Sequence, residues 1–183
     1  MQAPASEPVS LAEAKAHLRI AHADDDALVA SLITAARRVV EARTGLCLIS
    51  QQWLCLRDGW PEDGVIELPV APLIGVEEIG VFGEDDEKAV IEPAHYIVDA
   101  ASRPPRVLLR GSRLWPRPGR VVNGIGTRVM AGFGPNGAEV PQPLRRAVLL
   151  LVAHFFAQRG EETGGGLPVS LGALLAPYRR VRL

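Results

Sequence analysis

The sequence has little of what metal proteins and membrane proteins require. It contains only two cysteines, Cys47 and Cys55, with no CxxC pair and no histidine pair nearby, so we expect two small buried apolar side chains and not a zinc site. The longest apolar run, Ala147 to Phe156, is far shorter than the roughly 20 residues that a membrane-spanning helix needs. The N-terminus lacks a basic region followed by an apolar core, so a signal peptide is not expected. The sequence predicts a soluble protein that is made in the cytosol and has no membrane partner.

Catalytic patterns are missing as well. The four histidines fall in different segments without metal-ligand spacing: they are His17, His22, His95 and His154. The consecutive acids at residues 24–26 point in different directions from a helix start, so they are better explained as helix caps than as a cation site. The glycines of residues 124–137 lack the spacing of a phosphate-binding loop, and no GxSxG occurs. We expect no enzymatic activity, no cofactor and no bound metal.

The net charge of −1 hides an uneven distribution along the chain. Residues 1–102 hold 18 acidic and 7 basic residues, whereas residues 103–183 hold 3 acidic residues and 13 arginines. Such segregation can mark surfaces that bind charged partners. The two halves can equally neutralise each other, within one subunit or between neighbours. The sequence leaves these two interpretations open.

Two helix signals open the chain, after a Pro- and Ala-rich arm that we expect to be loose. Ser10 and Glu13 form a capping box, which predicts a short helix from residue 11. A second helix is expected to start at Asp24 or Asp25, because apolar residues repeat at helical spacing from there to residue 44. Gly45 supplies the left-handed stop. Residues 1–46 are therefore predicted to form an N-terminal arm and a helical hairpin.

The middle of the chain changes character. Residues 47–134 contain short segments rich in β-branched and aromatic residues, separated by Gly, Pro and Asp turns. This pattern predicts an antiparallel β-module of about six strands. The stretch from Gly83 to Asp86 is expected to be an exposed hairpin tip.

Helix signals return in residues 135–160, where Pro143 suits the first turn and Gly160 the C-terminal stop. From residue 147 to residue 156 this helix is apolar nearly all round, so it cannot lie on a solvated surface. Either it is central within its own domain, where it packs with the hairpin, or one face meets another subunit. In the second case the candidate interface residues are Val148, Leu151, Val152, Phe155 and Phe156.

Residues 161–183 begin as a flexible linker, with Gly164, Gly165 and Gly166, and close with a short apolar turn and a basic tail. Alternating bulky and basic residues suit docking into a partner's groove, but the leucines can instead fold back into the subunit's own core. The fold class that emerges is α+β. The N-terminal helical hairpin and the C-terminal long helix form a helical body, and the antiparallel β-module is inserted into it.

Six arginines crowd a Pro-rich stretch around Trp115, at positions Arg103, Arg106, Arg110, Arg113, Arg117 and Arg120. Arginine beside an aromatic ring can bind phosphate and stack on bases. A solvated loop around a packing tryptophan explains the same pattern, and both interpretations stay open.

Three stretches carry a family resemblance in a fixed order. The first is SLAEAKAHLRI, followed by the consecutive acids and by LVASLITAARRVVEARTGLCLISQQW. The second is RVMAGFG, followed by the apolar helix that runs through His154 to Arg159. The third is LLAPYRRVRL. Together they resemble the head-tail connector (adaptor) proteins of tailed phages, which also occur in gene transfer agents and prophages. Because the smaller connectors are nearly all-helical, the β-module places the resemblance with the longer branch of the family.

The resemblance implies a virion structural protein at the head-tail neck of a phage or gene-transfer-agent particle, assembled in the bacterial cytoplasm. Connectors form a ring, generally twelvefold, below the portal, extend the DNA channel and join the head to the tail. The implied partners are the portal protein, neighbouring copies, a downstream stopper or tail protein, and double-stranded DNA contacted without sequence preference. The residues expected to dock on the portal are Leu171, Leu174, Leu175, Tyr178, Arg179, Arg180 and Arg182.

Two alternatives to a connector are considered. A small DNA-binding or regulatory module would use the Arg-rich C-terminal half, although such a protein usually carries a net positive charge and this one stands at −1. Among virion proteins, a stopper or tail-completion protein is the nearest alternative.

Overall fold

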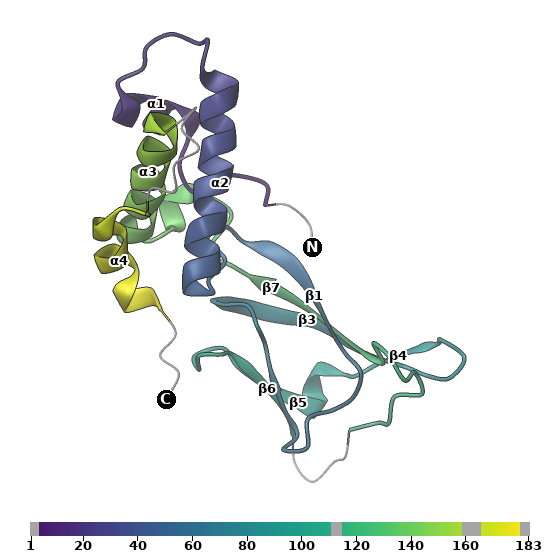
Figure 1. The fold of residues 1–183 in the computed structure, drawn as a ribbon. Helices are drawn as coiled ribbons and strands as arrows, with labels where there is room; N and C mark the ends of the chain where they lie inside the picture. The colour runs from purple at the N-terminus through teal and green to yellow at the C-terminus, as the bar shows by residue number, and fades with distance from the viewer. Residues whose placement is uncertain (1–3, 111–114, 159–165, 180–183) are drawn as a thin grey trace. The chain divides into compact units, whose positions relative to one another are not determined.

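The computed structural model describes residues 4–110, 115–158 and 166–179 (Figure 1). The chain divides into two compact units: a β-rich unit of residues 50–132, and a helical unit formed by residues 4–49 together with residues 133–183. The predicted α+β fold, with a β-module inserted into a helical body, is confirmed. Among the described residues, no helix is both long and apolar enough to cross a membrane.

The helical unit begins with the predicted hairpin. Helix α1 (Leu11–Leu18) starts at the expected capping box, in which Ser10 and Glu13 bond each other's backbone N–H groups. Helix α2 (Asp26–Thr44) ends at Gly45, whose φ of 70° is the left-handed conformation that glycine adopts without strain. Asp25 occupies the N-cap position of α2, but its side chain makes no capping hydrogen bond. The start of α2 was therefore placed correctly, whereas the expected side-chain cap is wrong.

Helix α3 (Gln142–Ala157) is the predicted apolar helix, and it follows the 3-10 turn η2 (Gly137–Glu139). It packs against α1, α2 and a short helix α4 (Val169–Leu175), which continues into the 3-10 turn η3 (Ala176–Tyr178). Because neighbours cover α3 on several sides, its apolar side chains are needed nearly all round. The first of the two interpretations of this helix, a central position in its own domain, is the one that the structure adopts.

The described part of the β-rich unit holds seven strands, one more than the expected six or so. They are β1 (Gln51–Arg57), β2 (Val65–Glu67), β3 (Leu73–Phe82), β4 (Lys88–Val90), β5 (Tyr96–Asp99), β6 (Arg106–Leu109) and β7 (Ile125–Ala131), with the 3-10 turn η1 (Pro93–His95) before β5. They form two antiparallel sheets, one in the order β1-β7-β3-β4 and one in the order β2-β6-β5.

Each sheet buries one face, as the alternation of side chains along a strand allows. The larger sheet buries Ile79, Ile125 and Val129, and the smaller one buries Ile66 and Val107. The predicted hairpin tip joins β3 to β4, where the Gly83 N–H donates to the Glu87 carbonyl and Asp86 has a φ of 66°. The long strands β1 and β7 pair along their whole length, although about 70 residues separate them in the sequence.

Candidate assembly surfaces

The residues proposed for a subunit interface on α3 divide into two groups. Val148, Leu151 and Val152 are completely buried in the core of the helical unit. They are inaccessible in the folded subunit and cannot contact a neighbouring copy, because α3 already packs against three helices of its own chain. Phe155 and Phe156 are half-buried and remain candidates for such a contact.

The C-terminal segment is also shared between core and surface. Leu171 and Leu175 are buried where α4 packs on α3, so these two leucines complete the subunit's own core and are not free to dock. Leu174 and Tyr178 are half-buried, and Arg179 is exposed. Arg180, Arg182 and the predicted helix stop Gly160 lie outside the described residues, as do Gly164 and Gly165 of the linker. The surface that remains for a partner in this segment is Leu174, Tyr178 and Arg179.

Four ion pairs join the acidic and the basic half of the sequence. Arg145 pairs with Glu13, Arg120 with Asp86, Arg106 with Asp99 at 2.8 Å, and Arg128 with Glu78 at 3.9 Å. Each pair joins an arginine of residues 103–183 to an acid of residues 1–102. Neutralisation within the subunit therefore accounts for four of the 13 arginines of residues 103–183.

Among the acids of these pairs, Asp99 has a strongly lowered pKa. Hydrogen bonds from the Ser102 hydroxyl at 2.6 Å and from the Arg106 guanidinium lower the pKa of Asp99 from 3.8 to about 2. Arg120 likewise lowers the pKa of Asp86, and its guanidinium also lies over the Phe82 ring at 4.2 Å. Two of the six arginines of the Arg-rich stretch, Arg106 and Arg120, are therefore engaged in structural contacts.

The other arginines of that stretch are more open. Arg103, Arg110 and Arg117 are exposed and form no ion pair within the described part of the chain, while Arg113 lies outside it. Trp115 is a packing residue: its ring stacks on Trp60 with centroids 4.3 Å apart, and its indole N–H donates to the Gly64 carbonyl. Because Trp60 covers one face of the Trp115 ring, the packing interpretation of the tryptophan is favoured over base stacking.

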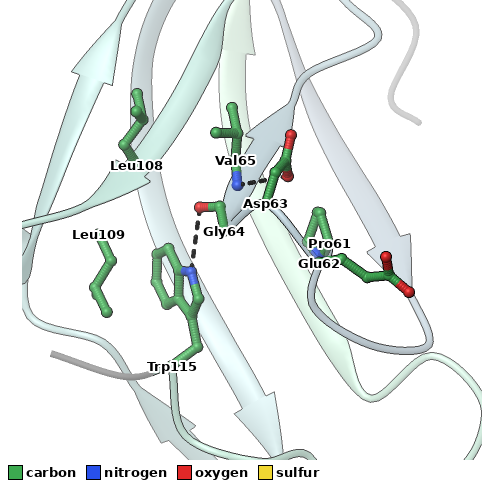
Figure 2. Close-up of a pocket in the computed structure, with 8 residues that line it drawn as sticks. All are labelled: Pro61, Glu62, Asp63, Gly64, Val65, Leu108, Leu109 and Trp115. Atoms are coloured by element: carbon green, nitrogen blue, oxygen red, sulfur yellow. Dashed lines mark hydrogen bonds between the residues drawn. The ribbon is translucent and has the colours of Figure 1, made fainter.

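Trp115 also lines a hollow of about 340 Å³ in the β-rich unit (Figure 2). The side chains of Val65, Leu108 and Leu109 give it apolar walls, and Glu62 and Asp63 lie on its rim. The Asp63 carboxylate accepts a hydrogen bond from the Val65 N–H and so serves the local turn. The described lining residues include no histidine, cysteine or hydroxyl group that could act as a nucleophile or base beside these acids.

Metal binding is likewise without a candidate site in the ranges that the structure describes, where no three His, Cys, Asp or Glu residues gather. Cys47 is buried, and burial raises the pKa of the half-buried Cys55 thiol. Cys47 therefore fits the prediction of a small buried side chain, whereas Cys55 is only half-buried.

Sequence reasoning missed one apolar surface. Leu54 and Leu56 of β1 and Val90 of β4 are about half exposed on the larger sheet. The signal was present in β1, where Trp53 and Cys55 alternate with Leu54 and Leu56, so that both faces of the strand are apolar. In a sheet with one solvated face, a strand needs apolar side chains on its buried face only. The apolar side chains on the other face of β1 therefore indicate an additional surface.

Comparisons with known proteins agree with this architecture. Residues 8–82 match the family model described as phage gp6-like head-tail connector protein. None of the curated proteins that were searched matches the sequence. Among solved structures, a chain of the virion of a native gene transfer agent (GTA) particle is 25% identical, with a TM-score of 0.87 over 100% of this chain and 95% of that chain.

Two neck structures are similar as well. A chain from the neck of an empty GTA particle, computed with C6 symmetry, is 26% identical with a TM-score of 0.83 over 100% of this chain and 95% of that one. A chain from the neck of a native GTA particle, computed with C12 symmetry, is 25% identical with a TM-score of 0.79 over 97% and 96% of the two chains. These likenesses include both compact units.

The fold and these matches define the class of the protein: it is a structural component of a virion neck. More particularly, the resemblance to head-tail connector proteins that the sequence predicted is confirmed, by the family match in the N-terminal part and by the neck proteins over the whole chain.

Proposed function

We propose that this protein is a head-tail connector subunit that forms a ring below the portal, extends the DNA channel and joins the head to the tail. The observation that carries the proposal is the whole-chain likeness to GTA neck proteins, with TM-scores up to 0.87. The family match alone covers only residues 8–82, whereas this likeness also includes the rest of the β-rich unit and the helices α3 and α4.

The proposed ring has twelve copies. Two of the similar neck structures were computed with C6 and C12 symmetry, which supports a repeated subunit arranged around an axis. The proposed neighbours are the portal on one side, a stopper or tail protein on the other, and further copies within the ring. Exposed arginines such as Arg103, Arg110 and Arg117 suit weak contact with phosphates of double-stranded DNA, without sequence preference.

Portal docking is assigned to the surface side of the C-terminal segment. The buried Leu171 and Leu175 hold α4 on the helical unit, and this attachment fixes the position of Tyr178 and Arg179. An aromatic ring followed by arginines combines apolar contact area with charge complementarity, which mainly sets specificity and encounter rate. Repetition around a ring adds avidity, so that a weak contact in each copy is sufficient.

The test is a double variant, Tyr178→Ala with Arg179→Ala, introduced into cells that produce the particles. We expect the purified variant to remain folded, with a melting temperature close to that of the wild type, because Arg179 is exposed and Tyr178 is only half-buried, and we expect the variant protein to be lost from particles. The measurement is the amount of this protein per major capsid protein, by quantitative mass spectrometry. Arg38→Ala is the matched control, since it removes another exposed arginine of the same unit.

Two results would contradict the proposal at different levels. Particles of the double variant with the full amount of the protein would reject docking through Tyr178 and Arg179. Wild-type particles in which the protein is absent, or present as a single copy at the portal, would reject the connector function itself.

A further inference from the structure

The larger sheet of the β-rich unit ends in two strands that have a partner on one side only. In the order β1-β7-β3-β4, the strands β1 and β4 are the edges. All three residues of β4 are exposed, and on β1 the side chains of Leu54 and Leu56 are 53% and 48% exposed. Proteins usually block such edges with proline or several charges, yet β1 contains no proline and only one charged residue, Arg57. The edge of β1 therefore lacks these devices, whereas β4 is only three residues long and includes Lys88, and each of the two strands has a paired strand on one side only.

The hydrogen bonds show which backbone groups of β4 point outward. The Ile91 N–H donates to the Ile79 carbonyl, and the Gly83 N–H donates to the Glu87 carbonyl. In an antiparallel ladder the N–H and C=O of one residue point to the same side, and successive residues alternate. Ala89 therefore faces β3, and Lys88 and Val90 present their N–H and C=O groups at the open edge.

The same argument fixes the outward groups of β1. The Phe82 N–H donates to the Gly124 carbonyl, so alternate residues of β3 bond to β7, and Gly126 of β7 faces β3. The residues of β7 that face β1 are then the intervening ones, Ile125, Thr127 and Val129, which pair with Arg57, Cys55 and Trp53. The residues of β1 whose backbone groups point outward are therefore Gln52, Leu54 and Leu56.

The two open edges also agree in the face on which their side chains lie. Residues paired across antiparallel strands share a face, and the register gives one row across the sheet: Leu56, Gly126, Gly80 and Val90. The row thus ends in an exposed leucine at one edge and an exposed valine at the other. At both edges, residues with outward backbone groups place apolar side chains on this face, Leu54 and Leu56 on β1 and Val90 on β4, beside the polar Gln52 and the charged Lys88.

We infer that β4 of one copy pairs with β1 of the next copy, so that the sheets of neighbouring subunits join into one ladder around the ring. The inference rests on the proposed connector function, because a ring requires two different surfaces that meet head to tail. The strands alternate in direction from β1 to β4, so an added β1 would lie antiparallel to β4. In an antiparallel pair, the outward groups of Val90 would bond to those of Leu54, with Lys88 opposite Leu56, or, in a register shifted by two residues, to those of Leu56.

Charge favours this occupant over an unrelated strand. The turn that precedes β4 carries four consecutive acids, from Glu84 to Glu87, of which Asp86 already pairs with Arg120 within the copy. Arg57 ends β1 at the level of Ile125 and Val81, which is the end of the sheet where that turn lies. Pairing between copies would therefore bring Arg57 of one copy to the acidic turn of the next, and opposite charges at this end would select the register.

A disulfide experiment tests the pairing within assembled particles. The variants combine Val90→Cys with either Leu56→Cys or Leu54→Cys, in a chain that also carries Cys47→Ala and Cys55→Ala. Within one copy Leu56 and Val90 are three strand spacings apart, or about 14 Å, which exceeds the reach of a disulfide. Paired between copies, their Cα atoms would be about 5.5 Å apart, which a disulfide spans.

We expect oxidised particles of at least one double-cysteine variant to give a ladder of linked oligomers larger than dimers on a non-reducing gel. The single variants should give no ladder, because a head-to-tail contact does not bring two copies of one residue together. Leu56→Cys with Ile97→Cys is the matched control, since Ile97 is similarly exposed but lies on the smaller sheet. A ladder in this control as well would mean random collision and would overturn the assignment.

Other outcomes separate this inference from the function on which it rests. Particles that contain the protein but give no ladder would reject the strand pairing and leave the connector function intact. A cross-link from position 54, 56 or 90 to a different virion protein would show that another partner occupies the edge. If the protein is absent from the particles, both the connector function and the pairing fail.

A proline variant distinguishes backbone pairing from side-chain contact. Leu54→Pro removes an outward N–H without removing a bond to β7, so the fold should retain its melting temperature. We expect the proline variant to be lost from particles and the Leu54→Ala variant to be retained. Equal retention of a folded Leu54→Pro protein would contradict pairing through the Leu54 N–H.

Discussion

The helical unit and the β-rich unit treat their large apolar side chains differently. In the helical unit the apolar helix α3 buries Leu144, Val148 and Leu151 completely. In the β-rich unit, Leu54, Leu56 and Val90 remain about half exposed on one face of the larger sheet. Scattered exposed apolar residues are common on any protein. Here the exposed residues lie at the two edges of one sheet, and their backbone groups also face outward, so they form a surface for association. The stretch that is most apolar in sequence is therefore core, and the less apolar strands offer the contact surface.

The same substitution in the two units gives the sharpest form of this comparison. Leu151→Ala should lower the free energy of unfolding by about 2–5 kcal/mol, because it removes buried methyl groups and leaves a cavity. Leu54→Ala should change it by less than about 1 kcal/mol, because half of that side chain is already in water. Urea unfolding of each purified variant measures the difference. Equal losses would mean that the exposed face of β1 supports the fold of the subunit as much as the core of α3 does.

Ion pairs allow a second comparison. Arg37 of α2 is buried and donates to Glu7 and Glu41, each at 2.8 Å. Although burial opposes its charge, these two carboxylates raise the pKa of Arg37, so it stays ionised. Arg37→Ala should cost about 1.5–3 kcal/mol, since it removes charged hydrogen bonds and leaves acids partly buried without their partner.

The matched change in the β-rich unit is Arg128→Ala. Arg128 lies 3.9 Å from Glu78 and is 42% exposed, so we expect a loss of at most about 1 kcal/mol. Added salt should weaken the Arg128 contribution more than that of Arg37, because exposed pairs are screened. Chemical unfolding at low and high salt measures both effects. A loss for Arg37→Ala as small as that for Arg128→Ala would show that the Arg37 cluster is only a surface feature.

The two units also differ in how far their structure could be predicted from sequence. Helix signals are local: the capping box of Ser10 and Glu13 and the stop at Gly45 lie within a few residues of the helix ends that they define. Strand pairing is not local. Nothing near residues 51–57 indicates that their partner is residues 125–131, and without that pairing the sheet order and its open edges are unknown. The candidate edge surface therefore required the structure.

The C-terminal segment shows a different reason for failure. Its glycine-rich linker and basic tail suggested an arm that is free to dock, and the leucines were assigned to a partner. Leu171 and Leu175 are instead buried against α3, because an apolar helix needs cover on every side and the nearest apolar residues in the chain supply it. Composition identified these leucines as apolar anchors. It did not show whether the surface on which these leucines pack belongs to the same chain or to a partner.

The smallest expected effect is the change in stability at low pH, where the two units contain the same arrangement of side chains. In each unit a carboxylate accepts hydrogen bonds from a nearby serine and pairs with an arginine: Glu13 with Ser10 and Arg145, and Asp99 with Ser102 and Arg106. These contacts lower the pKa of Glu13 and bring that of Asp99 to about 2. A carboxyl group with a lowered folded-state pKa stabilises the fold above its ordinary pKa, and it loses that contribution as the pH falls toward the folded-state value. For Asp99 this window lies between 3.8 and about 2.

The prediction for Asp99 is therefore a difference between wild type and Asp99→Asn that depends on pH. Above pH 5 the wild type should be the more stable protein by a constant amount. The difference should shrink as the pH falls below 3.8 and should vanish only below about pH 2, where Asp99 is protonated in the folded state as well. Ser102→Ala sharpens the test, since the Ser102 hydroxyl is the largest cause of the shift, and its removal should move the Asp99 titration back toward 3.8. Carboxyl titration by NMR measures the pKa directly, and urea unfolding across the same range measures the stability. An Asp99 midpoint near 3.8 in the wild type would contradict the assigned contacts, and the turn from β5 to β6 would then be held by its backbone alone.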